Sequence, residues 1–199
     1  MIFHYPDNPV KATPVTLLQL EQKEPGRYIG QLKWDGWRNI MYKESGKWVR
    51  HAKYDTGPQA KKPLPDALVA ELEALKLPEG TGFDSEWMGG RAVSSLGGRH
   101  YLILLDLHYL EGKWQGNETY ENRLKALKKL ILGAKEGCKT ATPNIELVQS
   151  VDLGLLALFE ASKKNPLTEG IIAKARDSKL IGNQTQAVDN KHWVKVKWR

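Results

Sequence analysis

The sequence Lys-Trp-Asp-Gly-Trp-Arg at residues 33–38 joins two segments that are typical of β-strands. The two segments, residues 27–34 and 37–43, contain the aromatic and branched apolar side chains that favour strands. Asp35-Gly36 between them is a dipeptide typical of a two-residue hairpin turn. The sequence therefore predicts a β-hairpin that holds the amine of Lys33 beside the turn and lets Arg38 reach back across it.

Outward from this stretch, the chain alternates between further strand-like and helix-like segments. Leu68, Leu72 and Leu75 recur at helical spacing, and Asp66 is the expected N-cap of that helix. The other expected elements are strands at 47–51, 83–87, 101–110, 169–175 and 192–198, an amphipathic helix at 118–135 and a short helix from Asp152. Helices inserted among short, sequence-local strands predict an α+β fold, and 199 residues suit a single domain spanning 1–199.

The composition limits the class of protein and of partner. The net charge is +7 and the isoelectric point is near 9.3, which favours a polyanionic partner, although many soluble proteins are simply basic. The single cysteine, Cys138, excludes an internal disulfide and suits a reducing cytoplasm. No apolar run reaches membrane-spanning length, and the first residues lack the form of a signal peptide. We therefore expect a soluble, cytoplasmic chain with no membrane partner.

Four charged residues could together attach a nucleotide to an amine: Lys33, Glu169, Lys195 and Lys197. An uncharged lysine can attack an α-phosphate, and a neighbouring cation such as Arg38 would disfavour its charged form. Glu169, at the start of an apolar strand, suits a Mg²⁺ ion beside phosphates. Strand alternation places Lys195 and Lys197 on one face, where an anion would relieve their repulsion. Taken singly, these features have plainer explanations, namely a surface hairpin and a solvated strand edge.

The order and spacing of these segments resemble the covalent nucleotidyltransferase superfamily, and within it most closely the adenylation domain of ATP-dependent DNA ligases. Residues 33–38 are similar to the first motif of that family, whose lysine becomes adenylated, and residues 169–174 and 193–197 are similar to its fourth and fifth motifs. Other segments that match in order are Val49-Arg50-His51 with Asp55-Thr56-Gly57, Asp84-Ser85-Glu86, the strand 105–110, Arg123 and Asp177-Ser178. The likeness covers nearly the whole chain, and several motifs in order are more specific than any one of them.

The resemblance implies mostly antiparallel sheets flanked by helices, with the nucleotide site between the sheets. The implied catalytic residues are Lys33, Asp35, Arg38, Lys195 and Lys197. The implied nucleotide-binding residues are Gln31, Leu32, Lys33, Arg38, Arg50, Glu86, Leu105, Glu169, Lys174, Lys195 and Lys197. The implied cofactors are ATP, which leaves AMP covalently on Lys33, and Mg²⁺, for which Glu169 is the implied ligand.

The activity that the resemblance implies is DNA ligation in three steps. Lys33 takes AMP from ATP, AMP passes to a 5′-phosphate at a nick, and a 3′-hydroxyl then displaces AMP. The implied partner is nicked double-stranded DNA, with or without RNA in its strands. We expect a monomer that acts in DNA replication, repair or recombination in a bacterium, phage or virus.

Three positions depart from the family pattern. Gln31 stands where ligases often carry a glutamate, Val49 replaces a serine, and Leu105 stands where an aromatic ring often stacks on adenine. Family ligases continue into an OB-fold domain, so we expect a chain without that domain and a separate chain as a candidate source of a DNA clamp. The sequence leaves open an RNA ligase, a GTP-dependent capping-type enzyme and a non-catalytic nucleotide- or DNA-binding remnant.

Overall fold

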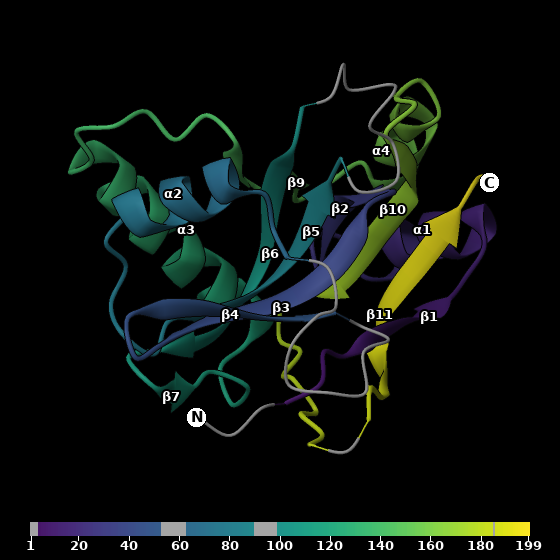
Figure 1. Ribbon diagram of the computed structural model, residues 1–199. Helices are drawn as coiled ribbons and strands as arrows, with labels where there is room; N and C mark the ends of the chain where they lie inside the picture. The colour runs from purple at the N-terminus through teal and green to yellow at the C-terminus, as the bar shows by residue number, and fades with distance from the viewer. Residues whose placement is uncertain (1–3, 53–62, 90–98, 185) are drawn as a thin grey trace.

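Two β-sheets build the protein, whose computed structural model describes residues 4–52, 63–89, 99–184 and 186–199 (Figure 1). The strands are β1 Asn8–Lys11, β2 Tyr28–Trp34, β3 Trp37–Glu44, β4 Lys47–Ala52, β5 Gly82–Met88, β6 Tyr101–Leu110, β7 Lys113–Trp114, β8 Ile145–Leu147, β9 Ser150–Val151, β10 Thr168–Ala175 and β11 Asp189–Lys197. One sheet has the order β1-β11-β10-β2-β9, and the other has the order β4-β3-β5-β6-β7 with β8 beside β6. All pairs are antiparallel except β1–β11 and β6–β8, so the expected α+β fold with mostly antiparallel sheets is confirmed.

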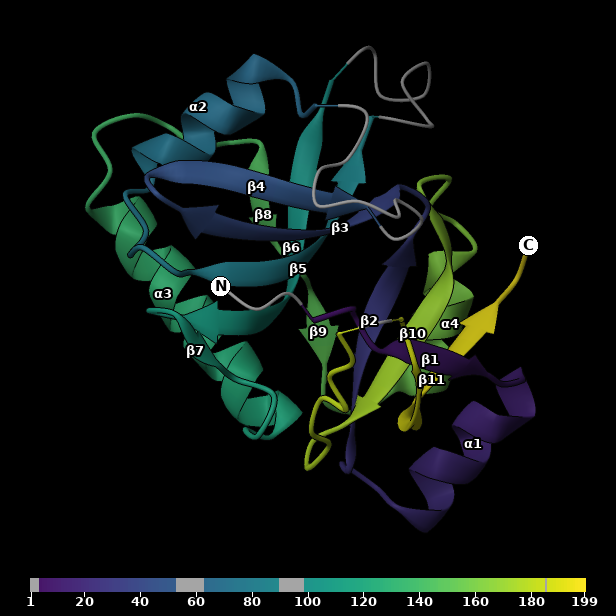
Figure 2. The same cartoon turned by 60° about the horizontal axis from the view of Figure 1, so that its bottom comes forward.

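Within the described ranges, four helices cover the outer faces of the two sheets: α1 Pro14–Lys23, α2 Asp66–Ala74, α3 Tyr120–Glu136 and α4 Leu155–Ser162. Helix α4 packs on β10 and β2 and α1 packs on α4, while α3 packs on β6 and α2 on β8. Figure 2 shows α1 and α4 beside the five-stranded sheet and α2 and α3 beside the six-stranded sheet. The inner faces of the sheets are left to form a site. None of the helices in the described part of the chain has both the length and the apolar character that a membrane crossing requires.

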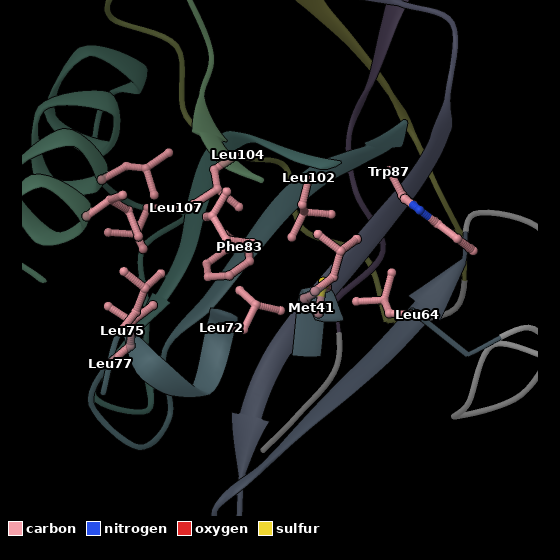
Figure 3. Packing of buried hydrophobic residues seen from close by; sticks show 14 residues of the cluster. Met41, Leu64, Leu72, Leu75, Leu77, Phe83, Trp87, Leu102, Leu104 and Leu107 are labelled. Atoms are coloured by element: carbon pink, nitrogen blue, oxygen red, sulfur yellow. The ribbon is translucent and has the colours of Figure 1, made fainter. Parts of the chain in front are cut away.

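The largest apolar core lies between the six-stranded sheet and helices α2 and α3 (Figure 3). Met41 and Phe83 come from the sheet and Leu72 from α2, whereas Leu127 and Ile131 come from the expected apolar face of α3. Each of these side chains is at most 1% exposed. Burial of one such side chain contributes about 1.5–3 kcal/mol, so this core fixes the six-stranded sheet as a rigid wall.

The hairpin expected at Asp35-Gly36 is wrong, because β2 and β3 belong to different sheets. The dipeptide instead carries the chain from one sheet to the other, and Gly36 lacks the positive φ that a type I′ hairpin turn requires. The Asp35 N–H donates to the Leu167 carbonyl at 2.9 Å, and the Gly36 N–H donates to the Glu86 carboxylate at 3.0 Å. A Cβ at Gly36 would lie 2.6 Å from the Trp87 carbonyl oxygen. Glycine is therefore needed at position 36, where the connection between the sheets passes close to β5.

Two helix starts also differ from expectation. The N-cap of α2 is Pro65, and Asp66 lies inside the first turn, where it makes no capping hydrogen bond. Its carboxylate there still interacts favourably with the helix dipole. Helix α4 begins after Gly154, which serves as N-cap in the left-handed region, and Asp152 lies outside it and pairs with Arg176. The sequence pattern does not predict the elements β1, α1, β7, β8 and β9.

Candidate active site

A cavity of about 440 Å³ opens between the two sheets, within the size range of small-molecule sites. The five-stranded sheet contributes β1, β2, β10 and β11 to its lining, and the six-stranded sheet contributes β3, β4, β5 and β6. The structure brings every site residue suggested by the sequence to this cavity: Gln31, Leu32, Lys33, Asp35, Arg38, Arg50, Glu86, Leu105, Glu169, Lys174, Lys195 and Lys197. Their chemical roles stay predictions.

One row of cross-strand neighbours crosses the five-stranded sheet on its cavity side. Gln31 on β2 pairs with Ile172 on β10, which pairs with Lys195 on β11, which pairs with Lys11 on β1. Neighbouring strands lie about 4.8 Å apart, and paired residues point to the same face. The row therefore leads from an amide, over an apolar side chain, to two lysines.

A second row, beside the first, holds the candidate nucleophile. Lys33 pairs with Gly170, and Gly170 pairs with Lys197. Gly170 has φ +146°, and a Cβ there would lie 1.9 Å from the Val196 carbonyl oxygen, so no side chain can separate the two lysines. The register of β10 shifts at Glu169, a β-bulge, and bulges redirect side chains. The Glu169 carboxylate accepts hydrogen bonds from both lysines.

The charge of Glu169 is stabilised by this arrangement. Burial raises its pKa, but hydrogen bonds from Lys197 and Lys33 outweigh burial and leave the pKa below its usual range. The carboxylate therefore stays ionised at neutral pH and holds the two ammonium groups on either side of it. An anion with more charge than one carboxylate could replace it as their partner.

A second β-bulge redirects Leu105 on β6. Asp84 on β5 pairs with Asp106, whereas the next residue, Ser85, pairs with Leu104, so Leu105 has no partner across the strands. Leu105 is half-buried and lines the cavity together with Ile172 of the opposite sheet. The two side chains give the cavity an apolar region at the end where Gln31 lies.

The opposite wall carries an arginine that is neutralised within its own sheet. Arg38 donates from Nε and Nη2 to Asp84 at 2.9 and 2.6 Å. Arg38 therefore does not reach across a hairpin, and the expectation that it disfavours the charged form of Lys33 is not supported by these contacts. Burial raises the pKa of Glu86, on the strand next to Arg38, to about 7, although Lys33 and Arg38 oppose the rise.

Lys174 lies at the floor of the cavity in an aromatic cage. Its amine is 4.2 Å from the ring centroid of Trp193, 4.5 Å from that of Tyr120 and 3.7 Å from the Asp106 carboxylate. Burial lowers the pKa of Lys174, and Asp106 opposes that effect. Asp106 is itself held by Arg123, whose Nε and Nη2 donate to it at 2.9 and 3.0 Å. Lys174 therefore belongs to a buried ionic cluster that supports the site.

Two further suggested residues are oriented by neighbours. The Gln31 amide nitrogen donates to the Tyr120 hydroxyl. The amide oxygen of Gln31 therefore points away from that hydroxyl. Arg50 donates to the Asn39 amide oxygen, and its guanidinium lies 5.1 Å from the ring centroid of Trp87. Asp55-Thr56-Gly57, which the sequence comparison grouped with Arg50, lies outside the described residues.

Sequence reasoning missed part of the lining: Asn8, Pro9, Lys11, Trp34, Gly36, Trp37, Asp84, Ile172 and Trp193. Strand β1 supplies three of these residues, and its four residues are too few to show a periodic pattern. Asp84 could have been found from the sequence, because it lies in the segment Asp84-Ser85-Glu86, in which the resemblance implies that Glu86 binds the nucleotide. Among the described residues, no three His, Cys, Asp or Glu side chains converge as a metal-binding group.

Solved structures of ATP-dependent DNA ligases share this architecture. A mycobacterial DNA ligase D complexed with ATP superposes with a TM-score of 0.71 at 21% identity, over 98% of this chain and 60% of that one. The fold of this chain is that of an ATP-dependent DNA ligase domain. The Chlorella virus DNA ligase-adenylate gives 0.58 at 17% identity, over 98% and 69%. The bacteriophage T7 ATP-dependent DNA ligase, in complex with ATP, gives 0.59 at 16%, over 96% and 68%.

These likenesses are structural. No family model matches the chain, and no curated protein matches its sequence. The chain spans about 60% of the length of the mycobacterial ligase chain, so that protein's whole activity does not transfer with the fold. The fold agrees with the resemblance drawn from the sequence motifs.

Proposed function

We propose that this chain is the catalytic core of an ATP-dependent DNA ligase, in which Lys33 is adenylylated and passes AMP to a 5′-phosphate at a nick. The observation that carries the proposal is the contact of Lys33 and Lys197 with one carboxylate, Glu169, inside a cavity of nucleotide size. A purely nucleotide-binding protein needs charged lysines for phosphate, but it does not need a lysine beside a carboxylate that can accept its proton before the amine attacks the α-phosphate.

The proposed orientation of the nucleotide follows the two rows of cavity residues. Adenine lies at the Gln31 end, between the apolar side chains of Leu105 and Ile172. Because the Gln31 amide nitrogen is engaged by Tyr120, its oxygen is the group available to the adenine amino group. The α-phosphate then lies at the second row, between Lys33 on β2 and Lys197 on β11, with Lys195 of the first row beside it, where its charge is most stabilised.

The remaining polar groups have roles that follow from this orientation. Arg50 and Glu86 lie on the six-stranded sheet and are assigned to the ribose and its neighbouring phosphate. Lys174 is assigned to charge balance beneath the nucleotide, because its amine is caged by rings and a carboxylate. Asp35 is assigned a positioning role, since it binds Arg199 at 3.0 Å and holds the connection between the sheets.

The proposed first step transfers AMP to the Lys33 amine. The Nζ lone pair forms the N–P bond as the bond from the α-phosphorus to the bridging oxygen breaks, and pyrophosphate leaves with that electron pair. Lys33 must lose a proton beforehand, and the ionised Glu169 beside it is the nearest group described that can accept one. Lys195 and Lys197 stabilise the charge that develops on the phosphoryl oxygens.

Mg²⁺ fits the site through Glu169 and through the nucleotide rather than through a protein cage. One carboxylate plus substrate phosphates is a common arrangement for this ion, and no larger acidic group is found among the described residues. When bound, the ion would withdraw charge from the phosphate oxygens. Glu169 would then exchange at least one lysine for the metal.

Incubation with labelled ATP, GTP or NAD, followed by a denaturing gel and intact mass, tests the proposal in one experiment. We expect a mass increase of one AMP with ATP alone, on a bond that is stable to base and labile to acid. Labelling by GTP alone would favour a capping-type enzyme. No label with any nucleotide would favour a non-catalytic remnant.

Nicked duplexes then separate DNA from RNA ligation. Strand joining at an all-DNA nick, with ATP, is the expected result, and joining restricted to RNA strands would favour an RNA ligase. The basic charge predicts that the affinity falls with salt, with a slope in log–log form of about −0.9 per phosphate contact.

A further inference from the structure

Lys11, on the short N-terminal strand β1, extends the cationic end of the cavity beyond the residues assigned above. It pairs with Lys195 across the parallel β1–β11 ladder, and the Ala12 N–H donates to the Lys195 carbonyl at 2.9 Å. Figure 1 shows β1 beside β11, although they lie at opposite ends of the sequence. The backbone of β11 therefore fixes where the Lys11 side chain starts.

The position of Lys11 in the row defines what it could reach. Gln31, Ile172, Lys195 and Lys11 succeed one another on adjacent strands, so Lys11 stands one strand, or about 4.8 Å, farther from Gln31 than Lys195 does. If adenine lies at Gln31 and the α-phosphate near Lys33 and Lys195, Lys11 faces whatever is attached beyond the α-phosphate.

None of the described residues neutralises the charge of Lys11. Among the described residues it makes no ion pair and no side-chain hydrogen bond, whereas Lys33 and Lys197 share Glu169. The Lys11 side chain is exposed to solvent and also lines the cavity. A strand lysine held beside a second lysine at a cavity rim is suited to an anion, since the anion would relieve the repulsion between them.

We propose that Lys11 binds a phosphoryl group beyond the α-phosphate, namely the β- and γ-phosphates of ATP before Lys33 is adenylylated. This inference rests on the proposed function for the orientation of the nucleotide. The same chemistry could come from a second source, the 5′-phosphate of a nicked strand that takes the place of pyrophosphate. Lys11 acts here as a positioning residue that aligns the leaving group.

The test compares nucleotides that differ only beyond the α-phosphate. Dissociation constants are measured for AMP and for an ATP analogue with a methylene between the α- and β-phosphorus atoms, which prevents turnover. Lys11→Met should weaken binding of the analogue by about tenfold, as expected for one charged hydrogen bond, and leave AMP binding unchanged. Lys11→Arg should restore the affinity. Lys47→Met, at an exposed strand lysine outside the cavity, is the matched control.

A second arm separates the two phosphate sources. Lys11→Met could instead leave analogue binding unchanged and weaken binding of a nick that carries a 5′-phosphate, while binding of a nick with a 5′-hydroxyl stays the same. That result would assign the phosphate to the nucleic acid. If Lys11→Met matches Lys47→Met with every ligand, the inference is overturned. Absence of an AMP adduct in wild type would refute the proposed function alone, because these binding constants remain measurable. Failure of wild type to bind any of these ligands would overturn both.

Discussion

Two charged regions of this protein use the same residue types under opposite conditions. Beneath the cavity, Arg123 and Asp106 form an ion pair in which both side chains are 0% exposed, and Lys174 joins them. At the rim, the side chains of Lys33 and Lys197 are 21% and 44% exposed and share Glu169. A buried pair that loses one partner leaves a charge without water, whereas a half-exposed lysine can exchange partners at little cost.

The difference in exposure separates residues that stabilise the fold from residues that are proposed to take part in AMP transfer. The buried cluster fixes β6, β10 and the start of α3 relative to one another, so it should be needed for folding. Lys33 on β2 and Lys197 on β11 both pair with Gly170 of β10, and their side chains are partly exposed, so they should be replaceable without unfolding. Stability and activity should therefore respond to different substitutions.

The largest expected effect is a loss of stability in the buried cluster. Asp106→Ala should lower the free energy of unfolding by about 3–5 kcal/mol, because Arg123 and Lys174 are left buried without their carboxylate. Urea unfolding followed by circular dichroism measures the change. A loss below about 1 kcal/mol would show that the cluster is hydrated and would remove the contrast with the rim.

The next effect is on activity at the rim. Lys195→Ala and Glu169→Gln should each slow single-turnover transfer of AMP to Lys33 by about 100- to 1,000-fold, because preorganised charge at the phosphate is lost. Both variants should unfold at nearly the same urea concentration as wild type, and Lys47→Ala provides the control for loss of a strand lysine. Near-normal single-turnover rates with Mg²⁺ would show that these residues have no role in AMP transfer and only form a solvated strand edge.

A smaller effect is the pH dependence contributed by Glu86, on β5 in the cavity wall formed by the six-stranded sheet. Its pKa of about 7 in the folded protein exceeds the usual 4.5, so the folded state binds more protons between these values. The free energy of unfolding should therefore fall as the pH rises from about 4.5 to 7, by at most about 1.4 kcal/mol per pKa unit. Glu86→Gln removes this contribution, so its stability relative to wild type should increase between pH 5 and pH 8. A constant difference across that range would contradict the assignment.

The smallest effect is expected at an ordinary surface pair, which gives the baseline for both regions. Lys125 pairs with Glu121 one turn away on α3, and the Lys125 side chain is 70% exposed. Lys125→Ala should change the free energy of unfolding by no more than about 0.5 kcal/mol and leave AMP transfer unchanged. A larger loss, measured by the same urea titration, would mean that exposed pairs matter here as much as buried ones.

The sequence predicted the regular elements and the membership of the cavity better than it predicted connections. The strands around Lys33 and Lys195 and the apolar face of α3 followed from periodicity, which depends only on local geometry. The direction of the chain at Asp35-Gly36 could not be predicted in this way. It depends on the contacts of Gly36 with Glu86 and Trp87, which lie on a strand distant in the sequence. Local turn statistics cannot include such a partner.

Two of the residues that enter the cavity are redirected by irregular pairing. Leu105 and Glu169 lie at register shifts in β6 and β10, and the shifts exist only once the partner strands are in place. Motif resemblance pointed to both residues, but alternation along either strand could not have given the direction of their side chains. Lys11 was missed for a different reason, since β1 is too short to be recognised and its partner strand lies at the other end of the chain.

The central claim is that the Lys33 amine becomes covalently adenylylated. Wild type and Lys33→Ala are incubated with ATP and Mg²⁺, and intact mass and peptide mapping locate any adduct, with acid and base treatment to define the bond. The account predicts an added AMP on Lys33 that acid removes and base does not, and an unlabelled but folded variant. Equal labelling of Lys33→Ala, or an adduct located on another residue, would contradict it.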